Sequence, residues 1–469
     1  MTNIELARRT IAAIRSLGVT DFCVCAGSRN APLLAVLGKT LQIKTYTFID
    51  ERSAAFFALG VGKRLGRPAC VVTTSGTAVA ELLPAAIEAY YSGVPLVLLT
   101  ADRPARFRGT GAPQSIDQQG IFGVHACRRI DDWDGTGVLH VNVEFDEPLI
   151  DDEVDADAPW PVRMRARVTP DLTPVPIAFE KPLLLIGGLA DEDRDRVREF
   201  ALQLNAPVYA EPLSGLREDE ALRDLLVLNE RSLPRGGFDG VIRIGNVPTL
   251  RFWRDVDRSD LGLMSFSRLR FPGLSRGEVH PIDALPEVKR RARDESFFMR
   301  DREQRARFES LLDAEPDSEL AIFRKLSREL PTGSRIYLGN SLPIREWDLA
   351  ATREQRGYII EANRGANGID GQLSTSFGWG ADFAIVGDLT ALYDLNAPWI
   401  RPKTDVIVIN NLGGRIFERV PTGAPELTLN EHTIAFDKWA AMFGIEVTEL
   451  RPNADASRRA WQRYDELWS

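Results

Sequence analysis

The chain has 469 residues, a length that predicts about three domains at roughly 150 residues each. Hydrophobic residues make up 44% and charged residues 27%, values typical of globular proteins, which excludes disordered, collagen-like and coiled-coil chains. The net charge of −9 and the lack of a long basic run disfavour nucleic-acid binding.

No segment of the sequence resembles a membrane span or a secretory signal. The longest strongly apolar stretch, near Val94–Ala101, is far shorter than the ~20 residues that a membrane helix needs. The first residues include Glu5 and lack an apolar core before a cleavage site. The four cysteines have no metal-site spacing and are too few for a disulfide scaffold. We therefore expect a cytoplasmic protein without membrane insertion.

The first third of the chain alternates short apolar runs with segments of helical period, which predicts a parallel sheet covered by helices on both faces. In Ile4–Leu17, for example, apolar residues recur three or four positions apart. The expected strands are Phe22–Cys25, Lys44–Ile49, Ala69–Thr73 and Leu96–Thr100, and the expected helices are Ile4–Leu17, Ser53–Leu65 and Ala78–Ser92.

The remaining two thirds repeat this alternation twice. The four prolines within Arg167–Pro182 predict an extended linker before the second unit. A second boundary is expected near Ala314–Ser318, where Asp317 or Ser318 can cap the following helix. The strands expected beyond the linker are Leu183–Ile186, Val208–Tyr209, Gly240–Ile244, Arg335–Leu338, Phe383–Val386 and Val406–Ile409, with a helix at Glu192–Leu204. The prediction is three α/β domains of similar size.

Two polar motifs end two expected strands of the last third. Gly387 and Asp388 end one strand, and Asn411 and Gly413 lie in the glycine-rich turn after the next. Ligands bind at the carboxyl ends of strands in open α/β sheets. A carboxylate, an amide oxygen and a glycine carbonyl are hard ligands suited to Mg²⁺ and a diphosphate. Two ordinary polar turns would explain either motif alone, whereas the pair at this spacing favours a metal site.

These motifs resemble the Gly-Asp…Asn signature of thiamin-diphosphate enzymes, which bind their cofactor through Mg²⁺. The resemblance implies an acid in the first domain that holds the protonated N1′ of the cofactor's pyrimidine, and Glu51 is the candidate. A carboxyl group in an apolar position shares a proton readily, because burial disfavours its charged form. A glutamate stabilised by the helix dipole at the start of Ser53–Leu65 would fit the same position.

Longer motifs resemble one family of this superfamily, the 2-succinyl-5-enolpyruvyl-6-hydroxy-3-cyclohexene-1-carboxylate synthases of menaquinone biosynthesis. The motifs are Cys25–Leu33, Asp50–Leu59, Thr74–Ala80, Leu99–Pro104, Gly339–Arg345, Asn363–Gly371 and Gly387–Asp394. The resemblance implies three doubly wound parallel-sheet domains: a pyrimidine-binding domain (1–168), a central Rossmann-like domain (182–312) and a diphosphate-binding domain (317–469). It implies a transferase that decarboxylates 2-oxoglutarate and adds the succinic-semialdehyde carbanion to isochorismate in a 1,4-addition. Another thiamin-dependent carboligase or 2-oxo acid decarboxylase is the alternative.

The resemblance also implies a substrate site rich in arginine, which binds carboxylates bidentately without losing its charge. The residues implied as catalytic are Glu51, Arg29, Arg345 and Arg364. The residues expected on the isochorismate side are Ser28, Arg29, Arg103 and Gln114. Those expected at the carboxylates of the 2-oxoglutarate-derived part are Ser341, Arg345 and Arg364. The apolar walls of the pocket are expected to be Ile416 and Phe417. A surface ion pair would explain any single arginine equally well.

The cofactor contacts follow from the same resemblance. Thiamin diphosphate is expected to meet Glu51, Ser75, Gly76, Ile369, Gly387, Asp388, Leu389 and Asn411, and Mg²⁺ or Mn²⁺ to meet Asp388, Asn411 and Gly413. Core packing would explain Ile369 as well, and a helix cap would explain the turn at Ser75. None of the four histidines lies in a recognisable motif. Because the two halves of a site come from two subunits in this superfamily, the resemblance implies a homodimer or a dimer of dimers.

The sequence departs from the family pattern in two motifs and in length. Ala26 stands where the family usually has proline, and Leu412 stands where it usually has the third asparagine of the metal loop. The segments before Phe383 and between Asp388 and Asn411 look shortened. These departures bear on the choice of acceptor substrate and on subunit assembly more than on cofactor binding.

Overall fold

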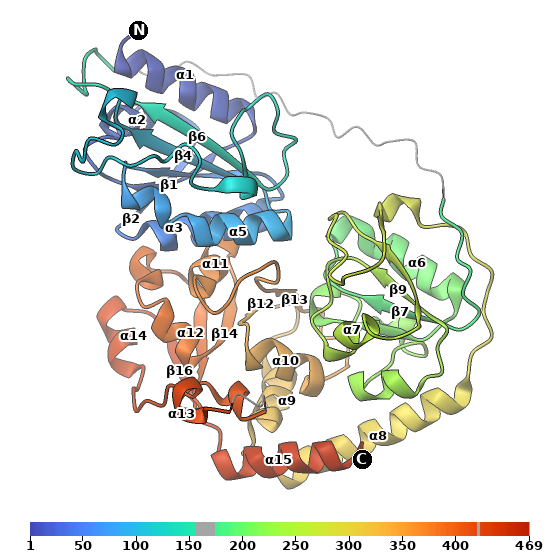
Figure 1. Ribbon diagram of the computed structural model, residues 1–469. Helices are drawn as coiled ribbons and strands as arrows, with labels where there is room; N and C mark the ends of the chain where they lie inside the picture. Colours follow the sequence, from blue (N-terminus) through green and yellow to red (C-terminus); the bar gives the residue numbers. More distant parts are fainter. Residues whose placement is uncertain (155–173, 420–422, 469) are drawn as a thin grey trace.

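The computed structural model describes residues 1–154, 174–419 and 423–468. Figure 1 shows three bodies: the first domain in blue and cyan, the central domain in green, and the third domain in orange and red. Much of the linker predicted over Arg167–Pro182, and with it the predicted end of the first domain, lies outside the described residues. No helix in the described part of the chain combines the length and hydropathy needed to cross a bilayer.

The first domain is built on a six-stranded parallel sheet in the order β2-β1-β3-β4-β6-β5. Its strands β3 and β4 are buried on both faces, as their continuous apolar sequences predict. The elements are α1 (Asn3–Ser16), β1 (Asp21–Cys25), α2 (Ala31–Leu37), β2 (Lys44–Phe48), α3 (Glu51–Leu65), β3 (Ala69–Thr73), α4 (Thr77–Ala80), α5 (Leu83–Ser92), β4 (Leu96–Asp102), η1 (Ala105–Phe107), η2 (Gly123–His125), β5 (Ala126–Cys127) and β6 (Val138–Glu144).

The helix expected over Ala78–Ser92 is interrupted, because α4 ends at Ala80 and α5 begins at Leu83. Pro84, in the first turn of α5, has no N–H to donate to the preceding turn. The proline therefore starts a new helix instead of continuing the old one.

The central domain has a five-stranded parallel sheet in the order β11-β10-β9-β7-β8. Its elements are β7 (Pro182–Ile186), η3 (Asp191–Asp193), α6 (Arg194–Leu204), β8 (Val208–Ala210), η4 (Pro212–Ser214), η5 (Glu220–Leu222), η6 (Glu230–Arg235), β9 (Gly240–Ile244), α7 (Arg251–Val256), β10 (Gly262–Phe266), β11 (Val279–His280) and η7 (Ile282–Ala284).

The third domain has a five-stranded parallel sheet in the order β13-β12-β14-β15-β16. Ser318 caps its first core helix, since its hydroxyl accepts from the Ala321 amide. The elements are α8 (Glu295–Ala314), α9 (Glu319–Glu329), β12 (Arg335–Leu338), α10 (Leu342–Ala350), β13 (Ile359–Glu361), α11 (Gln372–Trp379), β14 (Phe383–Gly387), α12 (Asp388–Tyr393), η8 (Ala397–Ile400), β15 (Asp405–Ile409), η9 (Arg415–Arg419), α13 (Pro425–Thr428), α14 (Asp437–Phe443), β16 (Val447–Leu450) and α15 (Ala454–Glu466). The three-part parallel α/β fold class is confirmed.

Helix α8 extends through the end of the predicted central domain. Phe297 and Phe298, near its start, pack in the core of the central domain. Phe308 and Leu312, near its end, pack in the core of the third domain. The helix therefore links the two cores, as its course along the bottom of Figure 1 shows.

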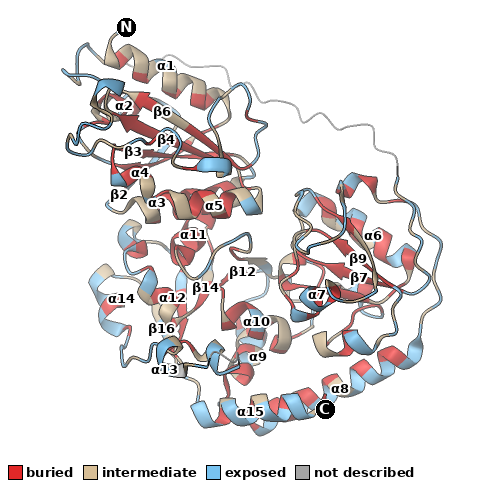
Figure 2. Ribbon diagram, viewed as in Figure 1, coloured by how far each residue is buried: buried red, intermediate tan, exposed pale blue. Residues whose placement is uncertain are grey.

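The first and third domains meet through α3 and α11, which are buried in Figure 2. The contact is close because glycines face the partner backbone: a Cβ at Gly60 would lie 2.0 Å from the Thr375 carbonyl oxygen. On the other helix, a Cβ at Gly378 would lie 2.0 Å from the Phe57 carbonyl oxygen. This packing places the start of α3 beside the third domain.

The central domain holds the third domain through Arg217. This buried guanidinium donates to the carbonyls of Asp348 at 3.0 Å and Thr352 at 2.8 Å, at the end of α10. The Tyr209 hydroxyl also donates to the Asp348 carboxylate, at 2.6 Å. These bonds satisfy helix-end carbonyls and fix α10, which carries the predicted site residue Arg345 and follows Ser341.

Candidate active site

The first domain places Glu51 at the first position of α3, directly after the edge strand β2. The Asp50 carboxylate caps this helix by accepting from the Ser53 amide at 3.1 Å. Glu51 is half-buried, and desolvation raises the pKa of its carboxyl group. A backbone hydrogen bond opposes this shift, while the charges of Asp50 and Glu81 add to it. This carboxyl group can therefore retain a proton at a higher pH than an ordinary glutamate.

Arg29 and Ser28 lie in the turn after β1, the strand next to β2. Ser28 is exposed, whereas the buried Arg29 guanidinium donates to the Phe145 carbonyl at 3.0 Å and lies 3.3 Å from the Glu147 carboxylate. Ser28 is thus open at the edge of the sheet, while Arg29 is held by residues that follow β6.

A third group of predicted residues surrounds the turn after β3. Ser75 is buried, and Gly76 adopts a φ of +84° that disfavours any side chain. A Cβ at Gly76 would lie 3.1 Å from Gln114 Cα, so glycine allows the chain after β4 to approach. Arg103 donates to the Pro113 carbonyl at 3.1 Å, which ties the two ends of this loop together. The structure thus brings Gly76, Gln114 and Arg103 to one edge of the first sheet.

In the third domain, Asp388 begins α12 at the carboxyl end of β14. Its buried carboxylate accepts from the Leu389 amide at 2.7 Å and from the Gly413 amide at 2.9 Å. Desolvation raises the pKa of Asp388, and these two amides and His432 oppose that shift. The half-buried Gly387 precedes it as the helix cap.

Asn411, two residues before the Gly413 that binds Asp388, offers a side-chain oxygen. Its amide nitrogen donates to the Glu319 carboxylate at 3.0 and 3.2 Å, and its Oδ1 is buried without a hydrogen-bond partner among the described residues. Desolvation raises the pKa of Glu319 to about 7, and the charge of Asp388 adds to the shift. An orphaned acceptor near a buried carboxylate is a setting that a hard cation would satisfy.

The predicted metal ligands fit a cation in two of three positions. Asp388 and Asn411 present oxygen atoms, whereas the Gly413 carbonyl accepts from the Arg415 amide at 2.9 Å and its own amide faces Asp388. Within the described ranges, no three His, Cys, Asp or Glu residues cluster as metal ligands. A metal here would therefore rely on one carboxylate, an amide oxygen and ligands from a diphosphate, as suits Mg²⁺.

His432 is a neighbour of Asp388 that the sequence patterns did not indicate. Its Nε2 lies 3.1 Å from Asp388 Oδ2, and its Nδ1 accepts from the Ile434 amide at 3.1 Å. The loop that carries it packs on the metal loop, since a Cβ at Gly413 would lie 2.5 Å from the Leu429 carbonyl oxygen. No motif surrounds His432, so only the folded chain shows its position.

Arg345 and Arg364 converge on one turn after β12. Arg345 is solvent-accessible and donates to the Ser341 carbonyl at 2.6 Å, and Arg364 donates to the Asn340 side chain at 2.5 Å. Ser341, with a φ of +70°, caps α10. The pKa of Arg345 is lowered to about 10, first by desolvation and then by the charges of Arg364 and Arg254. Two guanidinium groups held this close favour a bound anion.

The apolar members of the predicted site are less enclosed. Ile369 and Ile416 are half-buried, and Phe417 is 40% exposed on η9. Ile369 lies in the loop that carries Arg364, and Ile416 and Phe417 lie in η9, directly after the glycine-rich turn of Asn411 and Gly413.

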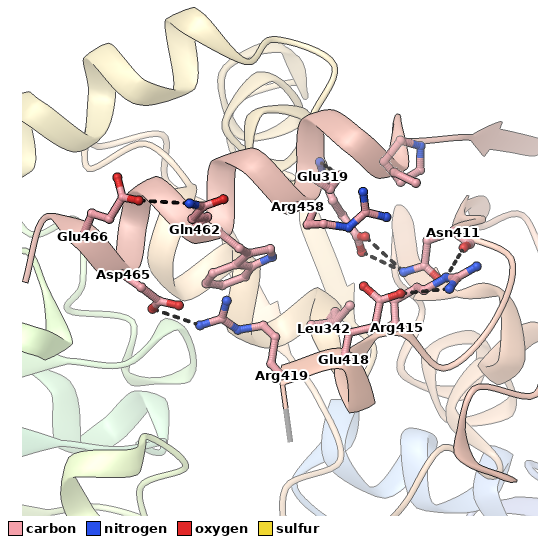
Figure 3. Close-up of a pocket in the computed structure, with 14 residues that line it drawn as sticks. Glu319, Leu342, Asn411, Arg415, Glu418, Arg419, Arg458, Gln462, Asp465 and Glu466 are labelled. Carbon is pink, nitrogen blue, oxygen red and sulfur yellow. Dashed lines mark hydrogen bonds and ion pairs between the residues drawn. The ribbon is translucent and has the colours of Figure 1, made fainter. Parts of the chain in front are cut away.

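A cavity of about 530 Å³ adjoins the metal loop on the side of α15. Figure 3 shows Asn411 bonded to Glu319 at one end of it, and Arg419 paired with Asp465 of α15 at the other. Arg345 and Arg364 do not line this cavity. The cavity therefore lies between α15 and the metal loop, the turn that carries Asn411 and Gly413. It is distinct from the arginine turn, the site where Arg345 and Arg364 converge.

Within one chain, Glu51 and Asp388 lie toward opposite ends of α12. The residues flanking Glu51 bind the far end of that helix: Arg52 donates to the Tyr393 carbonyl at 2.9 Å, and Asp50 accepts from Asn396 at 3.3 Å. Asp388 is the first residue of α12. The structure therefore gathers the site residues into a first-domain group and a third-domain group, and α12 lies between Glu51 and the metal loop.

Comparisons with known proteins indicate the class of protein. Residues 4–121 match the family model described as "Thiamine pyrophosphate enzyme, N-terminal TPP binding domain". The fold is similar to that of benzoylformate decarboxylase from Polynucleobacter necessarius, with a TM-score of 0.67 at 15% identity, over 100% of this chain and 97% of that one. The protein is a thiamin-diphosphate enzyme.

Relatives named 2-succinyl-5-enolpyruvyl-6-hydroxy-3-cyclohexene-1-carboxylate synthase specify the family. The protein from Bdellovibrio bacteriovorus is 39% identical across 100% of both chains. That from Akkermansia muciniphila is 38% identical across 93% of this chain and 90% of its own, and that from Nocardioides sp. is 36% identical across 98% and 90%. The chain belongs to this synthase family.

Proposed function

We propose that the protein decarboxylates 2-oxoglutarate and adds the remaining four-carbon unit to isochorismate by 1,4-addition, as a thiamin-diphosphate-dependent transferase of menaquinone biosynthesis. The full-length relationship to the named synthases carries this proposal. The arginine turn supports it, because Arg345 and Arg364 suit substrates with several carboxylates.

The cofactor would bind between the two groups of residues. Glu51 would hold the pyrimidine N1′ and its proton, with Ser75 and Gly76 nearby. Asp388 and Asn411 would bind Mg²⁺ or Mn²⁺ with the diphosphate, beside Gly387, Leu389 and Gly413, and Ile369 would support the cofactor's centre. When bound, thiamin diphosphate supplies a carbon nucleophile and stabilises the charge that decarboxylation leaves.

The side chains of this chain would bind and orient the substrates. Arg345, Arg364 and Ser341 would hold the carboxylates of 2-oxoglutarate. Ser28, Arg29, Arg103 and Gln114 would bind isochorismate, and Ile416 and Phe417 would exclude water from the reacting atoms. Arginine keeps its charge when partly buried, so these contacts persist in an enclosed site.

A homodimer, or a dimer of dimers, would complete the site, with Glu51 of one chain facing Asp388 of its partner. The position of α12 between these two residues within a chain supports this arrangement. An exposed apolar patch, made of Ile49, Tyr393, Leu395 and Trp399, lies beside Glu51 and suits burial in such an interface.

The test is a spectroscopic assay of isochorismate loss combined with CO₂ release, with 2-oxoglutarate, thiamin diphosphate and Mg²⁺. The proposal expects both signals in equal amounts, each dependent on the cofactor. CO₂ release without isochorismate loss would indicate another thiamin-dependent decarboxylase or carboligase. Absence of both signals with cofactor bound would contradict the proposal.

A further inference from the structure

The loop between β13 and α11 carries both Arg364 and Ile369, yet it has no regular secondary structure. Its backbone groups must therefore be satisfied by side chains or water. The Asn340 amide donates to the carbonyls of Asn363 at 2.9 Å, Asn367 at 3.0 Å and Gly368 at 2.8 Å. One side chain of the third domain thus holds three carbonyls of the loop.

The amides of the same loop are held by a carboxylate from another domain. Glu88, on α5 of the first domain, is fully buried. Its Oε1 accepts from the Gly365 amide at 3.0 Å, and its Oε2 accepts from Ala366 at 2.7 Å and from Asn367 at 2.9 Å. Three successive amides that point at one anion form a strong, geometrically specific contact.

We propose that Glu88 is a positioning residue for Arg364: its carboxylate fixes the loop so that the guanidinium faces the substrate carboxylate. This inference rests on the proposed function, because it assigns Arg364 to the distal carboxylate of 2-oxoglutarate. Glu88 does not touch the reacting atoms and acts through the loop.

The close fit of the loop on α5 supports this role. A Cβ at Gly365 would lie 2.9 Å from both the Glu88 carbonyl oxygen and its Oε2. The Glu88 carbonyl is itself held by the Ser92 hydroxyl at 2.6 Å. The loop therefore rests directly on α5, and a shift of the Glu88 carboxylate is passed to Arg364, one residue away from Gly365.

Within the described part of the chain Glu88 has no cation as an ion-pair partner, and its carboxylate accepts hydrogen bonds from the three loop amides. The nearby inter-domain ion pair joins Lys63 to Glu361 instead, at 2.9 Å. A glutamine at position 88 would keep the shape of the side chain but turn an NH₂ toward an amide N–H. This replacement should loosen the loop without opening a cavity.

The test compares 2-oxoglutarate with 2-oxopentanoate, which has the same length and lacks the distal carboxylate. For Glu88→Gln we expect the KM for 2-oxoglutarate to rise about tenfold, while kcat/KM for 2-oxopentanoate stays nearly constant. Glu361→Gln is the matched control, since it weakens the Lys63 ion pair between the same two domains. It should preserve the preference for 2-oxoglutarate over 2-oxopentanoate. If Glu88→Gln lowers kcat/KM equally for both substrates and also lowers the Tm, Glu88 has only a structural role and the inference is overturned.

Two further variants keep the inference falsifiable if Glu88→Gln folds poorly. Gly365→Ala places a methyl group against the Glu88 carbonyl and carboxylate, which pushes the loop away from α5, and it should reduce the preference for 2-oxoglutarate in the same way. The double variant Glu88→Gln, Arg364→Ala should have about the same kcat/KM for 2-oxoglutarate as Arg364→Ala alone. Additive losses of kcat/KM would contradict action through Arg364. A wild-type protein that binds cofactor but does not turn over 2-oxoglutarate would overturn the proposed function and this inference together. A wild-type protein that is active, with unchanged selectivity in both loop variants, would overturn the inference alone.

Discussion

Glu51 begins a helix at a position where its carboxyl group is partly dehydrated, which raises its pKa. In Glu51→Gln the side chain keeps its size and a hydrogen-bonding oxygen, but it cannot share a proton. We expect kcat to fall by about 10²- to 10³-fold, in the range of lost acid–base catalysis. Thiamin-diphosphate binding, followed by fluorescence titration, should change little. Undiminished turnover would contradict the role of Glu51.

Asp388 supplies the one carboxylate of the proposed metal site. Thiamin diphosphate with Mg²⁺ should raise the Tm of the wild-type protein, because a ligand that binds only the folded state stabilises it. Asp388→Ala should abolish this increase. Asp382→Asn is the control, since Asp382 is an exposed acid before the opposite end of β14 and binds the Arg335 amide. An equal increase in Tm for Asp388→Ala would exclude the metal assignment.

Among single residues, strand-end motifs led to Asp388 and Asn411 because their positions follow from local sequence and sheet topology, and the family resemblance then led to Glu51. His432 and Glu88 could not be found this way. Each meets its partner through a contact between distant segments, and no motif surrounds either. Their roles depend on which loops and helices the folded chain brings together.

The contact between α3 and α11 depends on glycine at the crossing. Gly60→Ala would place a methyl group 2.0 Å from the Thr375 carbonyl oxygen, so one helix must shift. We expect a loss of about 1–3 kcal/mol in the free energy of unfolding, as for other overpacked sites, measured by urea denaturation. Gly120→Ala is the control, because a Cβ there meets no atom within 4 Å. Equal stability of the two variants would contradict the close approach of the helices.

Glu211, in the central domain near Asp348 of the third, makes the free energy of unfolding depend on pH. Burial raises its pKa from 4.5 to about 7, and the charge of Asp348 adds to this shift. The folded state therefore holds the proton more tightly than the unfolded state, so wild-type stability should fall as the pH rises from about 4.5 to about 7. Glu211→Gln removes this loss of stability. It also keeps an oxygen that can accept from the Thr249 amide, which lies 2.7 Å from Glu211 Oε1 in the wild-type protein.

The stability of Glu211→Gln relative to wild type should thus increase between pH 5 and pH 8, by on the order of 1–3 kcal/mol. Urea unfolding at the two pH values measures this difference. Glu220→Gln, at an exposed position, should show no such trend. A difference that stays constant with pH would show that Glu211 is ionised equally in both states.

The strands and helices that periodicity predicted agree with the structure within a few residues, whereas most helices of the third domain, such as α10 and α11, were not predicted. The expected helix over Ala78–Ser92 was wrong as one element, because Pro84 interrupts it. Helix α8 ends at the predicted boundary near Ala314, yet its two ends bury apolar residues in different cores. Helical period shows where a helix lies, but not which core covers it.

For the whole molecule, the alternation of strands and helices predicted three parallel-sheet domains, and the structure confirms this fold class. How the domains dock was not predictable from the sequence. It depends on complementary surfaces, such as Gly60 against Thr375 and Arg217 against the end of α10. The proposed dimer depends on a further surface of this kind, the patch at Ile49 and Trp399.

The most direct measurement of a site shared between two chains is subunit complementation. Glu51→Gln and Asp388→Ala are each expected to be inactive alone, since each removes one half of every site. If the halves come from different chains, a mixed dimer contains one intact site. Equal amounts of the two variants, dissociated and reassembled at random, should then regain about a quarter of wild-type activity. If reassembled mixtures contain mixed dimers but stay inactive, Glu51 and Asp388 do not act on one cofactor across the interface.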